Sequence, residues 1–545
     1  MNQQVKTIDV VIVGAGFAGL YAIKRLRDAG FSVQAFEAGD GIGGTWYWNH
    51  YPGARVDLEC WDYSYSFSPE LQDEWDWPEK YPTAQELMRY LNHVADRFKL
   101  RDQIQFNTRV DAATFLEGEN LWLVRTSNGN ELKCRFFVPA TGGLSVPKPP
   151  EIPGVETFKG EAFHTGRWPR IEPSFSGKRI GVIGTGSSGV QTIQALAGKC
   201  KHLTVFQRTA VFVVPAKNHA LTPEMRQRVR ATYTERRNLS RMTRFGIPAA
   251  MPSESALDAT PEERKAKYEN AWINSQLLGF RQCYGDILSN MESNDTVAEF
   301  IRGKIREIVK DPEIARKLTP YGFPFGTKRP CLGDTYYSVF NRDDVTLVDL
   351  KTNPIVKIVP EGVVTSEGLI ELDMLIYATG YDALTGALTK IDVRGIGSQK
   401  LTDKWVNGPK AYLGLVTAGF PNMFTVTGPG SPGPLANMSM SIEQHIDWIT
   451  NCIQYMHENG AARIDADKNY EDKWMDHVQE VVGRTLYEKA NSWYRGANVP
   501  GKPQIFMPYL GGFGNYRKKC EDVAQAGYEG FVLTKSVSDQ SKLSA

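Results

Sequence analysis

Two glycine-rich turns of the form GxGxxG are the residues best suited to chemistry in this chain. They span Gly14 to Gly19 and Gly184 to Gly189, 170 residues apart. In such a turn the first glycine makes the tight bend, the second lets a pyrophosphate approach the backbone, and the third lets the helix pack on the strand. One dinucleotide needs one such turn, so the chain is expected to hold two dinucleotides.

The residues after each unit's second strand predict which dinucleotide is held. Glu37 lies 23 residues beyond Gly14, at the end of an expected strand over 31–36, where a carboxylate accepts hydrogen bonds from a ribose diol. In the second unit the expected strand 202–206 is soon followed by Arg208, whose guanidinium suits a 2′-phosphate. The sequence therefore predicts FAD in the first unit and NADP in the second.

The elements around both turns predict the fold. Residues 8–13 are an unbroken apolar, β-branched run, as expected of a strand buried on both faces of a parallel sheet. The following helix keeps its apolar residues on one side and stops at Gly30, and residues 178–196 repeat the design. A lone GxGxxG is a weak signal, but two in full context predict an α/β fold with two doubly wound, Rossmann-like domains.

Composition excludes several classes of protein. The 545 residues suffice for about three or four domain-sized units. Lysine plus arginine number 63 against 62 acidic residues, so no nucleic-acid partner is expected. Seven scattered cysteines without a CxxC pair argue against disulfides and metal ligation and favour a reducing compartment. No run of 18 apolar residues occurs, so we expect a cytoplasmic protein without membrane contact.

The chain is expected to cross between nucleotide domains where strand ends open into glycine, at 140–143 and 378–380. Several prolines between 147 and 153 stiffen the first crossing. The expected parts are a first FAD-domain segment at 1–145, a linker at 146–175, an NADP domain at 176–214 and 321–380, a helical insertion at 215–320, and the rest of the FAD domain with the C-terminal region at 381–545.

Helix signals place several elements in the insertion and beyond it. A capping box at 260–263 predicts a helix through Leu277, and two more helices are expected over 296–309 and 312–318. The insertion would form a substrate-side wall or a packing appendage, and the residues leave both readings open. The later expected elements are helices over 442–457 and 469–490 and glycine-rich loops over 428–434 and 511–515 that could close over a flavin.

Between the two turns, the pattern FxGxxxHxxxWP from Phe158 to Pro169 resembles the signature of the flavin-dependent Baeyer-Villiger monooxygenases. Residues 43–57, 326–330 and 491–494 match further motifs of that family. The resemblance covers essentially the whole chain and is closest to the cyclohexanone, phenylacetone and steroid monooxygenase group. It implies that NADPH reduces FAD and that dioxygen forms a C4a-peroxyflavin, which inserts one oxygen next to a ketone carbonyl to give an ester or lactone. The implied partners are a ketone and dioxygen, and the expected state is a monomer or weak homo-oligomer.

The resemblance makes Arg329 and Asp57 the catalytic residues. An anionic peroxide, and the oxyanion that forms when it attacks a ketone, both need a fixed cation near the flavin ring. Arg329 would be that cation, and Asp57 would pair with it and orient the guanidinium.

Further residues carried over by the resemblance would contact the cofactors. Lys328 would join Arg208 and Thr209 at the 2′-phosphate, and Arg55 and Trp493 would contact the nicotinamide half of NADP. Tyr63 and Met438 are expected at the flavin and Val110 at the adenine. The predicted cofactor-binding residues are Gly14, Gly16, Phe17, Ala18, Gly19, Glu37, Gly44, Thr45, Trp46, Tyr47, Trp48, Arg55, Val56, Asp57, Tyr63, Val110, Gly184, Thr185, Gly186, Ser187, Ser188, Gly189, Arg208, Thr209, Lys328, Arg329, Met438 and Trp493.

Three rival functions fit the residues less well. A flavin N- or S-hydroxylating monooxygenase shares the two-domain plan, but Trp168-Pro169 and Lys328-Arg329 favour the Baeyer-Villiger reaction. A disulfide reductase needs a CxxC pair, and a nicotinamide-sensing binding protein has no need of Asp57 together with Arg329.

For His164, a linker histidine that hydrogen-bonds backbone is favoured over a general base. The residues leave open which ketone is used.

Overall fold

The structure, a computed structural model, describes residues 5–274 and 279–535. Its first large sheet has seven strands in the order β17-β4-β5-β6-β1-β2-β3, and the β6-β1-β2-β3 half is parallel. The late strand β17 pairs with β4, so the chain returns to this sheet after leaving it. The strands are β1 (Thr7–Val13), β2 (Val33–Phe36), β3 (Ile104–Gln105), β4 (Val110–Leu116), β5 (Leu121–Thr126), β6 (Glu131–Pro139) and β17 (Asp392–Arg394).

The second large sheet has five parallel strands in the order β12-β9-β8-β16-β7. Its edge strand β7 carries Phe163 and His164, so the segment expected to be a linker also completes this sheet. Together the two sheets confirm the predicted α/β fold with two doubly wound units. The strands are β7 (Glu161–His164), β8 (Arg179–Ile183), β9 (His202–Gln207), β12 (Val345–Asp349) and β16 (Met374–Tyr377).

Three small sheets complete the strand set of the described residues. The pair β10-β11 joins the second unit to the segment after Arg329, a three-stranded meander follows β12, and β18-β19 lies near the C-terminus. These strands are β10 (Val213–Val214), β11 (Cys331–Leu332), β13 (Ile355–Val359), β14 (Gly362–Thr365), β15 (Gly368–Glu371), β18 (Ala461–Ala466) and β19 (Phe531–Lys535).

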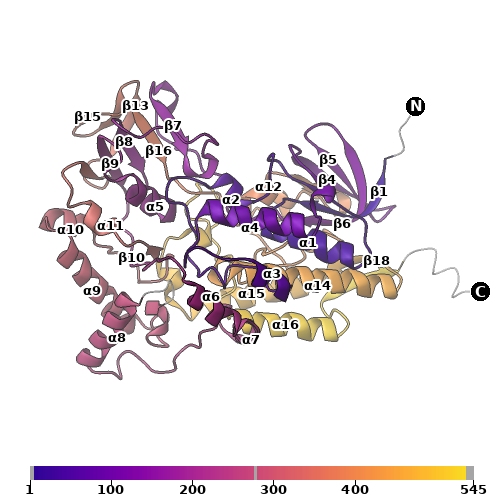
Figure 1. Ribbon diagram of the computed structural model, residues 1–545. Coiled ribbons are helices and arrows are strands. Elements are labelled where there is room, and N and C mark those ends of the chain that lie inside the picture. The colour runs from indigo at the N-terminus through magenta and orange to yellow at the C-terminus, as the bar shows by residue number, and fades with distance from the viewer. Residues whose placement is uncertain (1–4, 275–278, 536–545) are drawn as a thin grey trace, which may run out of the picture.

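Helices cover the sheets and fill the insertion. Figure 1 shows α8, α9 and α10 beneath the second sheet, and α14, α15 and α16 along the first unit. The helices are α1 (Phe17–Asp28), α2 (Thr45–Trp48), α3 (Pro69–Glu74), α4 (Ala84–Arg97), α5 (Ser187–Leu196), α6 (Pro223–Arg230), α7 (Tyr233–Met242), α8 (Pro261–Ile273), α9 (Met291–Ile308), α10 (Pro312–Leu318), α11 (Tyr336–Val339), α12 (Gly386–Thr389), α13 (Leu401–Lys404), α14 (Met438–Glu458), α15 (Lys468–Gly483) and α16 (Phe513–Gln525).

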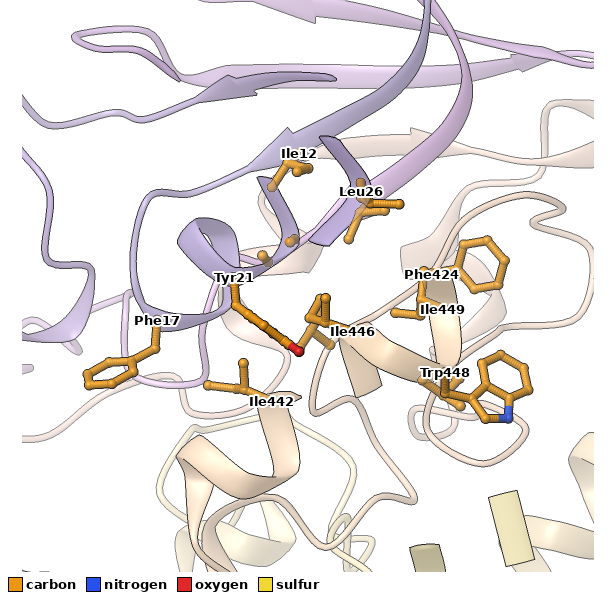
Figure 2. Packing of buried hydrophobic residues seen from close by; sticks show 14 of the residues in the cluster. Ile12, Phe17, Tyr21, Leu26, Phe424, Ile442, Ile446, Trp448 and Ile449 are labelled. Carbon is orange, nitrogen blue, oxygen red and sulfur yellow. The ribbon is translucent and has the colours of Figure 1, made fainter. Parts of the chain in front are cut away.

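The main core lies between α1 and α14. Leu20, Ile23 and Leu26 of α1 are fully buried, as their spacing on one helix face predicts. Figure 2 shows Tyr21 of α1 against Ile446 of α14, with Ile442 and Ile449 on the same helix, and all belong to one buried cluster. Because α14 is the longest helix of the described residues and belongs to the late part of the chain, this packing fastens the C-terminal region to the first dinucleotide turn.

Several helix limits differ from those expected. Helix α9 begins at Met291 rather than 296 because the side chain of Asn290 caps it, and α14 begins at Met438 rather than 442 because Asn437 does the same. Helix α15 ends at Gly483, and the rest of the expected helix to 490 is a short 3₁₀ turn. The predicted capping box at Thr260 is present, whereas Leu277 lies outside the described residues.

No helix within the described ranges is long and apolar enough to cross a membrane. Across those same ranges, no cluster of His, Cys, Asp and Glu side chains could hold a metal ion.

The second dinucleotide turn predicts a sharp contrast between two of its glycines. A Cβ on Gly189 would lie 2.1 Å from the carbonyl oxygen of Gly184, whereas a Cβ on Gly186 would meet nothing within 4 Å. We expect Gly189→Ala to lower the free energy of unfolding by about 1–3 kcal/mol or more, and Gly186→Ala to change it by less than about 0.5 kcal/mol. Denaturant unfolding of both variants checks this, and equal losses would contradict it.

Candidate active site

Arg329 and Asp57 meet in a two-point ion pair. The Nε and Nη2 of Arg329 donate to the two carboxylate oxygens of Asp57 at 2.6 and 2.7 Å, and Nη1 donates to the Pro434 carbonyl at 3.0 Å. Both side chains are about three-quarters buried, with 24% and 26% of their surface exposed. Burial opposes the charge on Arg329, but Asp57 outweighs it and holds the pKa of the guanidinium above its ordinary value.

Four segments far apart in the sequence converge on this pair. Asp57 ends the motif 43–57, Arg329 stands just before β11, and Pro434 belongs to the glycine-rich loop before α14. The fourth segment brings the fully buried Tyr494, whose pKa burial raises to about 12 while the nearby charge of Arg329 pulls it down. The catalytic residues that the resemblance named are therefore brought together.

The motif 43–57 packs against the first dinucleotide turn. The amide of Gly43 donates to the Ala15 carbonyl at 3.1 Å, and a Cβ on Gly44 would lie 2.7 Å from the Cα of Gly16, so only glycines allow this approach. The Glu37 carboxylate accepts the amides of Ala15 and Gly39. The carboxylate expected to bind the ribose thus stands directly at the turn, and burial raises its pKa.

Aromatic side chains line the next part of the first unit. The ring of Tyr63 lies 5.1 Å from Phe17, edge to face, and its hydroxyl accepts the indole N–H of Trp46 at 3.3 Å. Asn437, which caps α14, donates to the carbonyl of Asp62, so Met438 begins its helix next to Tyr63. The positions expected at the flavin are therefore brought together.

Three residues that were expected to contact the cofactors also form contacts within the protein. Tyr47 is buried against the 39–43 turn, and its hydroxyl donates to Asp40. Arg55 forms an ion pair with Glu79 at 3.2 Å. Val110 is buried as the first residue of β4, just after a loop in which the amide of Thr108 donates to the carbonyl of Glu37.

Two cations without carboxylate partners stand at the second turn. Burial, and then the neighbouring Arg208, lower the pKa of Lys328. Within residues 5–274 and 279–535, no carboxylate lies within 4 Å of either cation. Thr209 lies beside them, since its carbonyl accepts the Thr185 hydroxyl at 3.0 Å. A corner of this kind suits a doubly charged phosphate.

The start of α5 is tied to neighbouring segments by its two serines. The Ser187 hydroxyl lies 3.6 Å from the thiol of Cys331, two residues beyond Arg329, and Ser188 accepts the Thr165 hydroxyl at 3.3 Å. The helix start that follows the second glycine turn therefore touches both the crossing segment and the loop of Arg329.

One connecting residue was missed by the sequence analysis. The Oε1 of Gln191, in α5, accepts the Tyr51 hydroxyl at 2.9 Å, and its Nε2 donates to the Arg55 carbonyl at 3.1 Å. Gln191 thereby fastens the helix of the second turn to the segment that ends in Asp57. No sequence signal marks it, because a glutamine inside a helix is ordinary.

His164 bonds backbone in the crossing, as expected of a linker histidine. Its Nδ1 accepts the amide of Gly166 at 2.9 Å, and Nε2 lies 3.0 Å from the Lys148 carbonyl. Burial lowers its pKa, so the ring is neutral and donates through Nε2. The C-terminal segment also reaches the crossing. The Nζ of Lys148 donates to the carbonyl of Asn498, which follows Trp493 closely in the sequence.

Known proteins resemble this chain over nearly its whole length. A profile of the pyridine nucleotide-disulphide oxidoreductase family matches residues 11–290. The chain is 43% identical over 97% of both chains to the cyclohexanone 1,2-monooxygenase of an Acinetobacter species. A solved structure of oxidized steroid monooxygenase bound to NADP is 46% identical, with a TM-score of 0.94 over 97% of this chain and all of that one.

The chain belongs to the Baeyer-Villiger monooxygenase family. The resemblance inferred from the motifs at 158–169 and 43–57 is thereby confirmed. The family is not uniform in its reactions, because a phenazine N-monooxygenase of Lysobacter antibioticus is 40% identical over 96% of this chain and 97% of its own. All seven cysteines are free.

A buried histidine supports the loop that bonds Arg329. His445 of α14 accepts the amide of Thr427 at 3.0 Å through Nδ1 and contacts the Tyr516 hydroxyl at 2.7 Å through Nε2. Thr427 has a positive φ of 53°, which is strained for a β-branched residue, and the loop to Pro434 starts there. Burial lowers the pKa of His445 to about 3.

This histidine predicts a pH dependence of stability. Since the folded pKa lies below the unfolded value of about 6.5, its contribution is complete above pH 6.5 and is lost as the pH falls. Between pH 7.5 and 5.5 the wild type should lose about 1.4 kcal/mol more than His445→Gln, which keeps an acceptor and a donor. Denaturant unfolding at both pH values measures this difference, and parallel losses would exclude the assignment.

Proposed function

We propose that the protein is an NADPH- and FAD-dependent Baeyer-Villiger monooxygenase that converts a ketone and dioxygen to an ester or lactone. The observation that carries the proposal is the Arg329 guanidinium, fixed at two points by Asp57. Membership of the family supports it.

The residues of the first unit fit FAD. Gly14, Gly16 and Gly19 would receive the pyrophosphate, Glu37 the adenosine ribose, and the aromatic group around Tyr63 the ring system. The buried Glu37 keeps free lone pairs beyond the two amides it accepts. Bound there, FAD would supply the redox chemistry, taking a hydride from NADPH and activating dioxygen.

The residues of the second unit fit NADP. Gly184, Gly186 and Gly189, with the serines that start α5, would hold its pyrophosphate, and the open space beside Gly186 leaves room for it. Lys328 and Arg208 would hold the 2′-phosphate, because they are neighbouring cations at the second turn without carboxylate partners among the described residues.

Arg329 would act on the ketone oxygen. A guanidinium has five N–H donors, and Arg329 uses three of them on Asp57 and Pro434. Tyr494 also lies within hydrogen-bonding reach of the guanidinium, and a donor that these groups leave unused can donate to an oxyanion developing at the carbonyl. Asp57 contributes geometry rather than charge state, because a guanidinium is protonated at every working pH. Burial of the pair by Tyr494 and the 431–435 loop limits access of water.

N-oxygenation of an aromatic amine-like heterocycle is a second candidate, favoured by the identity of 40% to the phenazine N-monooxygenase. The two reactions differ in what the fixed cation contributes. Attack on a carbonyl develops an oxyanion that Arg329 can stabilise, whereas attack by nitrogen develops none on the substrate.

The remaining properties are also proposals. We place the protein in a reducing compartment, the cytoplasm, because all seven thiols are free. We propose a monomer or weak homo-oligomer. We keep the division into an FAD domain at 1–145 and 381–545 and an NADP domain at 176–214 and 321–380, because the two large sheets draw their strands from these ranges apart from β7.

Ketone turnover tests the proposed function. Purified protein with FAD and NADPH should turn at least one member of a panel of cyclic, aryl and steroidal ketones into an ester, identified by mass spectrometry. Phenazine assayed in parallel distinguishes the second candidate. N-oxide formation without ester from any ketone would overturn the proposal.

Replacing Arg329 should separate the two halves of the reaction. Arg329→Ala should retain FAD and be reduced by NADPH at close to the wild-type rate, but form ester at least about a hundredfold more slowly, because the oxyanion loses its donors. Anaerobic reduction followed by stopped flow, and ester yield in air, measure the two steps. Oxygenation at near the wild-type rate would remove the assigned role.

Replacing Arg208 should affect one cofactor and not the other. A charge-assisted contact to phosphate contributes about 1.5–3 kcal/mol, so Arg208→Ala should raise the KM for NADPH about ten- to a hundredfold and leave NADH nearly unchanged. Arg170, which is exposed and stacks on Tyr47, offers a matched control that should change neither. Equal effects on both cofactors would show that Arg208 does not read the phosphate.

A further inference from the structure

The loop that carries Arg329, residues 323–330, is held by two buried polar side chains of the helical insertion. Asn294 lies in the first turn of α9 and is fully buried, and Arg281 lies in the 3₁₀ turn before it with 3% of its surface exposed. Neither contacts Arg329 or belongs to any recognised motif. Both bond backbone atoms of the loop.

Asn294 pairs with the loop as a neighbouring strand would. Its Oδ1 accepts the amide of Phe325 at 2.8 Å, and its Nδ2 donates to the Phe325 carbonyl at 2.9 Å. The second N–H of the amide donates to the Ile287 carbonyl at 2.7 Å, so both donors of the side chain are used within the protein. The backbone of Phe325 is therefore fixed relative to α9.

Arg281 fixes the next residue of the loop. Its Nη2 donates to the Gly326 carbonyl at 2.6 Å. Gly326 has a φ of +81°, and a Cβ there would lie 2.8 Å from Leu288 and 3.1 Å from the Nε of Arg281, so the loop passes directly over the guanidinium. Lys328 and Arg329 follow two and three residues later.

Burial of the Arg281 guanidinium is expected to destabilise the folded protein. No carboxylate stands within 4 Å of it in residues 5–274 and 279–535, and its Nε is buried there without a hydrogen-bond partner. A buried charge without a counter-ion destabilises a protein unless it is compensated, so packing alone gives no reason for an arginine here. The hydrogen bond that compensates the buried charge is the one to the carbonyl of the loop that bears Arg329.

The other end of the loop is fixed by the second unit. Beyond Pro330, Cys331 and Leu332 form β11, which pairs with β10. The loop is therefore clamped by the insertion at 325–326 and by a strand at 331–332, and Arg329 stands between the two clamps.

We propose that Arg281 and Asn294 are positioning residues of the active site, which fix the 323–330 loop so that Arg329 meets Asp57 and the ketone oxygen in one orientation. The insertion is then part of the catalytic apparatus and neither a substrate wall alone nor a packing appendage. This inference rests on the proposed function for its catalytic consequence, but not for the rigidity of the loop.

Arg281→Met tests the inference, and Arg302→Met is its matched control. Arg302 lies in α9 of the same insertion and also donates to a backbone carbonyl, that of Pro320 at 3.0 Å, outside the 323–330 loop. Hydrogen exchange of peptides covering 323–332 reports loop rigidity without any turnover. Ester formed per NADPH consumed, anaerobic reduction rate and melting temperature report the catalytic and folding consequences.

We expect Arg281→Met to exchange faster at 323–332 and to lose about ten- to a hundredfold in ester formed, the range of one charge-assisted hydrogen bond, with the reduction rate within about twofold of wild type. Arg302→Met should lower the melting temperature without either change. Should Arg281→Met fail to fold, Arg281→Lys, which keeps the charge and one donor, should show smaller shifts in the same direction.

Unchanged exchange at 323–332 in both Arg281 variants would overturn the inference, as would a reduction rate that falls in parallel with ester formation. If the wild type forms no ester but Arg281→Met still exchanges faster than the wild type at 323–332, the positioning role stands and the proposed function is rejected.

Discussion

The ion pair between Arg329 and Asp57 is the interaction on which the rest of the structure depends, because its partners come from different units. Asp57 ends a motif that closes the first dinucleotide turn, and Arg329 stands in a loop between the insertion and β11 of the second unit. Two hydrogen bonds in one plane tolerate little displacement. The pair can therefore form only when the two units and the insertion occupy one mutual arrangement.

Each partner is supported by contacts that cross the same boundary. Gln191 of α5 holds the segment from Tyr51 to Arg55, two residues before Asp57. Helix α5 begins at the second dinucleotide turn. The same helix therefore contacts both a ligand bound at that turn and the segment that carries Asp57, the carboxylate that orients Arg329. Positioning of this kind is what reactions between two bound molecules require, since a small misplacement of a reacting group costs much of the rate.

The fold could be predicted because it leaves local signals in the sequence, whereas the pairing of Arg329 with Asp57 was implied by the family resemblance. Glycine spacing, apolar strand runs and the capping box at Thr260 are patterns of neighbouring residues, and each reappears in the structure. Gln191, Asn294 and Arg281 leave no such signal, because their roles consist of single hydrogen bonds to backbone atoms distant in sequence. The helix starts at 291 and 438 were misplaced for a smaller reason, since asparagine caps without a glutamate or glutamine three residues later are weak signals.

The distribution of charge explains why the cations near the site are not interchangeable. Arg329 has a carboxylate partner, which fixes its direction and leaves donor capacity of the guanidinium for a transient oxyanion. Lys328 and Arg208 have no carboxylate partner among the described residues, which suits a phosphate that arrives with its own charge. Arg281 is buried and has no carboxylate partner in the part of the chain that the structure describes, and it donates instead to a carbonyl of the loop that bears Arg329. A carboxylate beside Arg281 would satisfy it more cheaply, but would also weaken the positive potential around the buried Tyr494 and Arg329, where negative charge must develop. A carbonyl partner fixes the loop without adding a compensating charge, and that combination gives a physical reason for an arginine at this position.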